Sequence, residues 1–301
     1  MLLFEQMLVL FFYMMIGHIT CKKKILDEDF GNKISWLVLN IANPMMIISS
    51  AVNSEGSIKG EELIITAVVA VIIYIFLLFI AVLVPKIFKI EKRDAGYFQL
   101  MTVFNNIGFM GFPVISAMYG SDALLYASVF LLPYNILFYT YGINLLSTTK
   151  QRLSLKKILN IGVIASFLAV ILYLTQIPVP QFVKSASQGL SHLTAPLSMI
   201  VIGISLAKLS MKELFLDIQI LLFAIMKLLF IPIFSIFIIK RIITIPVLQG
   251  VCMVMLATPA GSMTAMLAQQ YGGDYKKVAQ GVALTTLLSV LTIPLVSILV
   301  L

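Results

Sequence analysis

The stretch Phe104-Asn-Asn-Ile-Gly-Phe-Met-Gly-Phe-Pro113 lies in the middle of a long apolar segment. It contains two adjacent amides, two glycines and a proline. Proline removes a backbone donor and clashes with the preceding turn, and glycine weakens a helix. We therefore expect a transmembrane helix to break here and to leave polar backbone groups in apolar surroundings.

The composition of the whole chain predicts that its solvent is lipid. Of 301 residues, 60% are hydrophobic and 11% are charged, which is too little charge for a soluble protein of this size. The net charge of +8 comes from short basic clusters between apolar segments, so we expect no nucleic-acid partner. Cys21 and Cys252 have no spacing typical of a metal site, and we expect no metal and no cofactor.

Ten apolar segments follow one another along the chain, each near the roughly 20 residues that a helix needs to cross a bilayer. The predicted transmembrane helices cover residues 2–20, 35–52, 63–84, 98–119, 123–147, 158–176, 186–207, 218–239, 247–270 and 278–300. The predicted fold class is therefore an all-α membrane protein with ten transmembrane helices.

The second five segments repeat the layout of the first five. Tyr119-Gly-Ser-Asp122 recurs 152 positions later as Tyr271-Gly-Gly-Asp274, and Pro196 follows Pro44 by the same 152 positions. A unit of five spans is odd in number, so its second copy enters the membrane with the opposite orientation. Inverted repeats of this kind are typical of secondary transporters.

Two inverted five-helix repeats, residues 1–150 and 151–301, are therefore the predicted domains. The distribution of Lys and Arg supports the alternation. Sixteen of them lie in loops after the odd-numbered helices and four in loops after the even-numbered ones, with Lys227 as the remaining one of the 21. Basic loops stay in the cytoplasm, so both termini are predicted to lie outside it.

The ninth segment carries a second disruption, Ala257-Thr-Pro-Ala-Gly-Ser-Met-Thr264. The offset of 152 aligns Pro259 with Ile107, inside the disrupted stretch of the fourth segment. Breaks at matching positions of two repeats indicate a transporter binding site. The alternative is a pair of proline-kinked packing helices, because Gly and Pro are common in membrane helices. The candidate substrate-binding residues in these stretches are Asn105, Asn106, Gly108, Pro113, Thr258, Pro259 and Gly261.

Asn43 and Lys227 complete the set of candidates. Asn43 lies in the second segment, where hydrogen bonding between helices is the alternative to a substrate role. Lys227 is the only basic residue deep in a segment, and a lysine at the bilayer centre costs roughly 2.5–3.5 kcal/mol. It therefore needs a wet cavity or a partner, unless its long stem snorkels to the interface.

An anionic substrate is the expectation that follows from these charges. A cavity-facing Lys227 and the N-terminal ends of broken helices would both contribute positive charge. No Asp or Glu lies equally deep, and either Na⁺ or H⁺ remains open as the coupling ion.

A catalytic role is not expected for this chain. An intramembrane aspartyl protease needs two carboxylates in one site, whereas Asp122 and Asp274 fall on opposite sides of the predicted membrane. Their predicted role is to cap the turns that lead into the next helices.

The chain resembles the auxin efflux carrier family, which includes bacterial malate and malonate permeases and the plant PIN-type carriers. The resemblance covers the whole chain and is carried by Asn106 followed by Gly111-Phe-Pro113 and Met118-Tyr-Gly120, and by Ala257-Thr-Pro-Ala-Gly261 followed by Tyr271. The chain departs from the plant members in lacking a long hydrophilic central loop, and in having Thr258 where an Asn is expected.

The resemblance implies that helices 4 and 9 are broken and cross at the substrate site. It also implies a scaffold of helices 1, 2, 6 and 7, a transport domain of helices 3–5 and 8–10, and a homodimer through the scaffold. The predicted function is a secondary active transporter in a cell (inner) membrane for a small organic anion of the malate, malonate or auxin type. The alternatives are a sodium-coupled symporter of a larger organic anion, similar to bile-acid symporters, and an anion channel.

Overall fold

The computed structural model describes residues 2–54, 58–146, 158–207, 211–270 and 275–300, and apart from one isolated β-bridge its regular elements are all helices. The predicted all-α class is confirmed. The elements, with η marking π-helical segments, are α1 (Leu2–Lys22), α2 (Glu28–Leu37), η1 (Val38–Ala42), α3 (Asn43–Val52), α4 (Gly60–Ile87), α5 (Lys92–Val103), η2 (Ile107–Gly111), α6 (Phe112–Tyr119), α7 (Ala123–Val129), α8 (Leu131–Leu137), η3 (Phe138–Gly142), α9 (Ile143–Leu146), α11 (Ile161–Thr175), α12 (Gln181–Ser191), α13 (Thr194–Ala207), α14 (Met211–Leu216), α15 (Ile218–Ile225), η4 (Met226–Phe230), α16 (Ile231–Ile242), α17 (Pro246–Ala257), α18 (Ser262–Gln270) and α19 (Tyr275–Val300).

Six continuous helical stretches in the described part are long and apolar enough to cross a membrane. They are Glu28–Val52, Gly60–Ile87, Ala123–Leu146, Gln181–Ala207, Ile218–Ile242 and Lys276–Leu299. Three further apolar helices are shorter, namely Ile107–Tyr119, Ile161–Thr175 and Pro246–Ala257. The boundary predicted between residues 150 and 151 and the motif at 271–274 lie outside the described residues.

Three of the π-helical segments end two residues before a proline. Pro44, Pro113 and Pro232 each lie in the first turn of the α-helix that follows η1, η2 and η4, respectively. A proline has no N–H for the carbonyl four residues earlier, and its ring collides with that carbonyl. A wider π-turn is one way for a helix to continue past such a residue.

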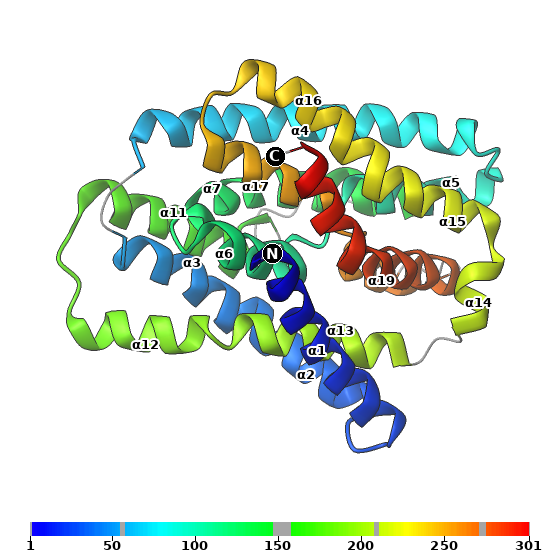
Figure 1. Ribbon diagram of the computed structural model, residues 1–301, viewed down its shortest axis with the longest axis horizontal. Helices are drawn as coiled ribbons and strands as arrows, with labels where there is room; N and C mark the ends of the chain where they lie inside the picture. Colours follow the sequence, from blue (N-terminus) through cyan, green and yellow to red (C-terminus); the bar gives the residue numbers. More distant parts are fainter. Residues whose placement is uncertain (1, 55–57, 147–157, 208–210, 271–274, 301) are drawn as a thin grey trace.

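The helices form two groups, and each group combines segments that are far apart in sequence. In Figure 1, α1–α3 and α11–α13 occupy the lower and left part of the molecule, while α4, α5, α15–α17 and α19 occupy its upper and right part. Within the first group α1 packs along α13, and α3 packs against α11 and α12. Within the second group α4 packs on α5, and α19 contacts α15, α16, α17 and α18.

The contact between α1 and α13 depends on two glycines. A Cβ atom on Gly17 would lie 2.1 Å from the carbonyl oxygen of Ile200, and one on Gly203 would lie 2.0 Å from that of Met14. No side chain fits in such a space, and small residues that let backbones approach are typical of membrane helix pairs. The pair α1–α13 is therefore joined backbone to backbone.

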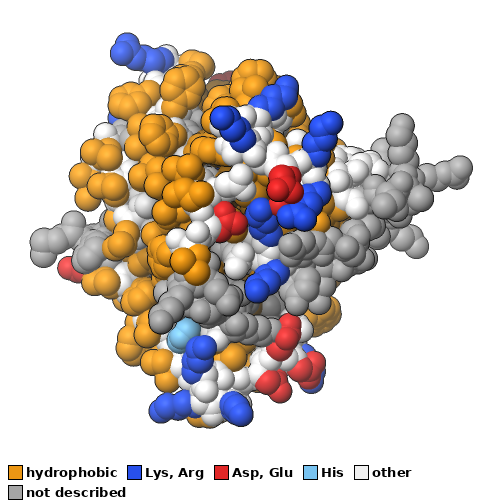
Figure 2. Space-filling view, turned by 90° about the vertical axis from the view of Figure 1, so that its right-hand side faces the viewer, with side chains coloured by type: hydrophobic (Ala, Val, Ile, Leu, Met, Phe, Trp, Pro, Cys, Tyr) orange, Lys and Arg blue, Asp and Glu red, His pale blue; other side chains and the backbone are white. Residues whose placement is uncertain are grey.

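Many charged side chains lie at one end of the molecule. In Figure 1, α4 ends on the right, where α5, α15 and α19 begin, whereas α4 begins on the left, where α11 connects to α12. Figure 2 looks at the right-hand end and shows Lys and Arg side chains gathered there with several acidic ones.

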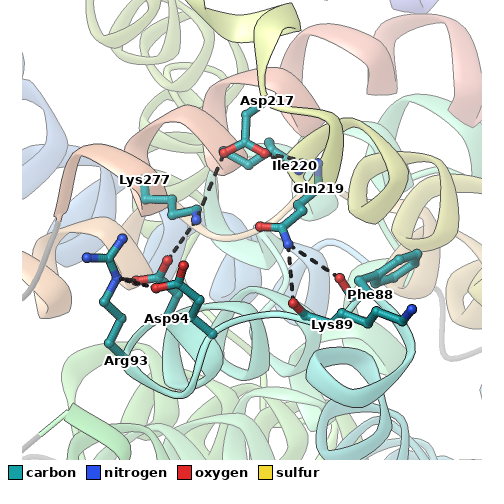
Figure 3. A network of polar contacts seen from close by, with 9 residues as sticks. Phe88, Lys89, Arg93, Asp94, Asp217, Gln219, Ile220 and Lys277 are labelled. Atoms are coloured by element: carbon teal, nitrogen blue, oxygen red, sulfur yellow. Dashed lines mark hydrogen bonds and ion pairs between the residues drawn. The ribbon is translucent and has the colours of Figure 1, made fainter.

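A polar network joins three helices at this end (Figure 3). The Lys277 ammonium of α19 lies 2.7 Å from a carboxylate oxygen of Asp94 in α5 and 4.0 Å from one of Asp217. Asp217 also caps α15, because it accepts hydrogen bonds from the backbone of Gln219 and Ile220. One lysine thus ties the starts of α5, α15 and α19 together.

Candidate functional site

The two disrupted stretches of the sequence meet in the interior. The helical path is interrupted at residues 104–106 and again at 258–261, and we call the contact between these two segments the junction. The backbone N–H of Asn106 donates to the Pro259 carbonyl at 2.8 Å, and the backbone N–H of Gly261 donates to the Phe104 carbonyl at 2.8 Å. These two bonds form an antiparallel bridge between Asn105 and Ala260. The backbone groups that each break frees are therefore largely satisfied by the other break.

The close approach at the junction requires a glycine. A Cβ atom on Gly261 would lie 3.1 Å from the Asn105 carbonyl oxygen and 3.2 Å from that of Phe104. Both neighbours are backbone atoms held by the bridge, so they have little freedom to move aside. Ala260 completes this side of the junction by donating its amide to the Thr285 hydroxyl of α19 at 3.2 Å.

Two carbonyls still lack their helical partners. The backbone N–H of Asn106 would reach the Thr102 carbonyl in a continuous helix, but it donates to the Pro259 carbonyl instead. Pro259 has no N–H to offer the Met255 carbonyl. The Lys227 ammonium donates to the Thr102 carbonyl at 2.7 Å, and the Thr258 hydroxyl donates to the Met255 carbonyl at 3.0 Å.

The Asn105 side chain links the Lys227 ammonium to the Met255 carbonyl. Its Oδ1 accepts a hydrogen bond from the Lys227 ammonium, and its Nδ2 donates to the Met255 carbonyl. Asn105 and Lys227 are buried, and the lysine has no exposed surface. Both hydrogen-bonding ends of the Asn105 amide are thus used within the protein.

A cavity of about 270 Å³ lies against the junction. Its residues come from both halves of the sequence and include no charged side chain among those described. They are Leu39, Asn40, Asn43, Ile47, Asn105, Asn106, Ile107, Gly108, Phe109, Phe112, Leu131, Tyr134, Asn135, Tyr139, Asn160, Ile161, Gly162, Gly261, Ser262 and Met263. The polar character of the cavity comes mainly from six asparagines, and its apolar character from aromatic and aliphatic residues.

Two of these asparagines hold unpartnered polar atoms. The Asn43 Nδ2 donates to the Gly108 carbonyl at 3.0 Å, which leaves its buried Oδ1 without a partner in the described structure. The Asn106 Nδ2 is likewise buried and has no protein partner there. Leaving a buried polar group unpaired costs roughly 1–3 kcal/mol, so such groups are candidates for binding a ligand.

The nine candidate residues divide into two sets around the cavity. Five of them line it, namely Asn43, Asn105, Asn106, Gly108 and Gly261. The other four lie outside its lining, where Thr258, Pro259 and Lys227 serve the hydrogen bonds of the junction and Pro113 lies buried in the first turn of α6. The lysine is enclosed among protein oxygens, so neither the cavity-facing nor the snorkelling orientation describes it.

Asn135 and Asn160 belong to the cavity although the sequence analysis did not select them. The Asn160 Nδ2 donates to Asn135 Oδ1 at 2.6 Å, and Asn135 Nδ2 donates to the Leu131 carbonyl at 2.7 Å. Asn160 also caps α11 by accepting from the Val163 amide. An amide inside or at the edge of an apolar segment was the signal that selected Asn105, and the same signal marks these two.

The predicted capping role of Asp122 is wrong. Asp122 makes no side-chain hydrogen bond to the start of α7, and instead accepts one from the Ser54 hydroxyl at 2.9 Å. Asp122 thereby connects the end of α3 to the turn before α7.

Comparison with known proteins places this geometry in context. A family model described as "Membrane transport protein" matches residues 2–297 of the chain. An uncharacterized transporter from Methanocaldococcus jannaschii is 26% identical over 304 residues, which cover 97% of this chain and 96% of the relative.

Proposed function

Because the chain belongs to the membrane transport protein family of the auxin efflux carrier type, we propose that it is a secondary carrier for a small organic anion, a mono- or dicarboxylate. Family membership makes it a multi-pass membrane transport protein and not an enzyme. The substrate and the mechanism of alternating access are our proposals.

The observation that carries this proposal is the cavity at the junction. Its walls bring the unpartnered side-chain nitrogen of Asn106 together with the first turns of two helices, at Gly108 of η2–α6 and Ser262 of α18. Helix N-termini carry free N–H groups and partial positive charge, which favour a carboxylate. An anion can therefore bind here although no cationic side chain lines the described cavity.

The architecture that we propose has ten membrane spans in two inverted repeats. Its fourth span is α5 with η2–α6 and its ninth is α17 with α18, and the two cross at the junction. The Lys and Arg side chains at the end shown in Figure 2 support a cytoplasmic location for that end, with both termini on the other side of the cell membrane.

The proposed movement is one helix group against the other. The group α1–α3 with α11–α13 would serve as the scaffold and as the dimer contact, and the remaining helices would carry the substrate. Two side-chain hydrogen bonds beside the cavity connect these groups, Asn43 to Gly108 and Asn160 to Asn135. They would have to break and re-form as the cavity opens to alternate sides.

Counterflow in proteoliposomes tests this function. Purified protein that is preloaded with unlabelled malonate or malate should accumulate the labelled compound, which a channel cannot do. Asn106→Ala should lower uptake at limiting substrate by about tenfold or more, because a hydrogen bond to a charged ligand contributes roughly 1.5–3 kcal/mol. Asn53→Ala is the matched control, since the described hydrogen bonds of the Asn53 side chain stay within its own helix end. Unchanged uptake by Asn106→Ala would disprove the site assignment.

A further inference from the structure

The Lys227 ammonium is held by two neutral oxygens of the kind that also bind small cations. The ammonium contacts the Thr102 carbonyl oxygen at 2.7 Å and the Asn105 amide oxygen, both of them neutral acceptors. Within the described part of the chain no ion pair involves Lys227. Backbone carbonyl and amide oxygens without their own donors are typical ligands of hard cations in membrane transporters.

The local fold explains why a cation belongs at this point. The Thr102 carbonyl is at the C-terminal end of α5, where a helix carries partial negative charge, and its helical donor has been diverted to Pro259. Lys227 reaches it from η4, a π-turn that precedes Pro232. The lysine is wholly buried and does not itself line the cavity, although Asn105, one of its two acceptors, does.

We propose that the Lys227 ammonium is a tethered cation in a cation site of the junction, and that a free Na⁺ or small alkylammonium ion can occupy the same oxygens once the side chain is removed. This inference rests on the proposed function only for its transport readout. It makes two statements that a packing role for Lys227 does not make. Wild-type protein needs no free cation at the junction, and a truncated variant becomes cation-dependent.

Thermal unfolding of purified protein, without substrate, tests the site directly. Lys227→Ala should unfold several degrees below wild type in N-methylglucamine chloride. Replacing that salt with NaCl, or with methylammonium chloride at equal ionic strength, should raise its Tm by about 2–4 °C when the cation exceeds its Kd about tenfold. Lys227→Met is the matched control, because its side chain fills the space without a charge and should show no such rise.

Uptake into proteoliposomes supplies the second readout. Wild-type uptake should not change when N-methylglucamine replaces Na⁺, whereas Lys227→Ala uptake should fall about tenfold or more and recover saturably with Na⁺ or methylammonium. An equal response of the Ala and Met variants to cations would overturn the proposal. If Lys227→Ala does not fold in N-methylglucamine chloride, it should fold in NaCl or methylammonium chloride, and failure to fold in every salt while Lys227→Met folds would also overturn the proposal. Failure of the proposed function would abolish only the uptake signal and leave the Tm shift intact.

Discussion

Two adjacent asparagines have different hydrogen-bonding states, although both line the same cavity. Asn105 has a partner for each end of its amide, Lys227 at Oδ1 and the Met255 carbonyl at Nδ2. Asn106 has a buried Nδ2 that no described protein group accepts. At the scale of single residues, the first asparagine therefore belongs to the structure of the junction and the second is available to a ligand.

This difference predicts opposite effects of the same substitution. Asn105→Ala should lower the free energy of unfolding by about 3 kcal/mol, because it removes one of the two acceptors of the buried Lys227 ammonium and one of the two side-chain donors to the buried Met255 carbonyl. Asn106→Ala should change it by less than about 1 kcal/mol, since no protein hydrogen bond is lost at Nδ2. Thermal unfolding in detergent measures both. Equal destabilisation by the two substitutions would contradict this assignment of roles.

At the scale of elements, the junction is a contact between two interrupted helices that leaves little room for an added atom at Gly261. Gly261→Ala places a Cβ 3.1 Å from the Asn105 carbonyl oxygen. We expect a loss of about 1–3 kcal/mol in unfolding free energy and a loss of uptake, because the bridge must widen. Gly189→Ala in α12 is the control, since a Cβ there meets nothing within 4 Å. That variant should be neutral or slightly stabilising, because alanine favours a helix.

The ion pair between Lys277 of α19 and Asp94 of α5 yields a second prediction at this scale. The Asp94 side chain is 5% exposed and Lys277 is 18% exposed, so Lys277→Met leaves a nearly buried carboxylate with Arg93, at 3.5 Å, as its one remaining basic partner among the described residues. We expect a loss of about 2 kcal/mol in unfolding free energy, less than for a fully buried pair. Lys33→Met removes an exposed pair with Asp29 and should have no measurable effect. Similar Tm values for the two variants would show that the ion pair between Lys277 and Asp94 does not stabilise the contact between α5 and α19.

The sequence predicts the elements of this fold better than their contacts. The interruptions near Pro113 and at Pro259 are predictable, because proline and glycine act on the backbone within one turn. The partner of Lys227 is not predictable in the same way, since the Thr102 carbonyl becomes available only after Asn106 has bonded to Pro259. Such an exchange depends on two segments about 150 residues apart, and no local pattern records it.

The same distinction applies to the candidate site. Asn43, Asn105 and Asn106 could be selected because an amide in an apolar segment needs a polar partner. The role of each could not be assigned, since the sequence does not show which amide finds its partner within the protein. Asn135 and Asn160 carry the same signal, and they reach the cavity only because α8 and α11 pack together.

At the scale of the whole molecule, the two helix groups are joined by side-chain hydrogen bonds beside and beyond the cavity. Ser54, at the end of α3, donates to Asp122, at the turn before α7, with 2.9 Å between their oxygens. The proposed scaffold holds Ser54 and the proposed transport group holds Asp122. A movement of one group against the other must separate this pair, whereas a rigid pore would leave it in place.

A cross-link at this pair should therefore stop transport. Ser54→Cys combined with Asp122→Cys, with Cys21 and Cys252 replaced by serine and alanine, should lose uptake after treatment with a short thiol-reactive cross-linker. Each single cysteine in the same background should keep its uptake under the same treatment. A reducible cross-linker should allow recovery after reduction, because a trapped carrier is not a denatured one. Uptake that continues in the fully cross-linked protein would exclude a relative movement of the two groups at this point, and would favour a channel over alternating access.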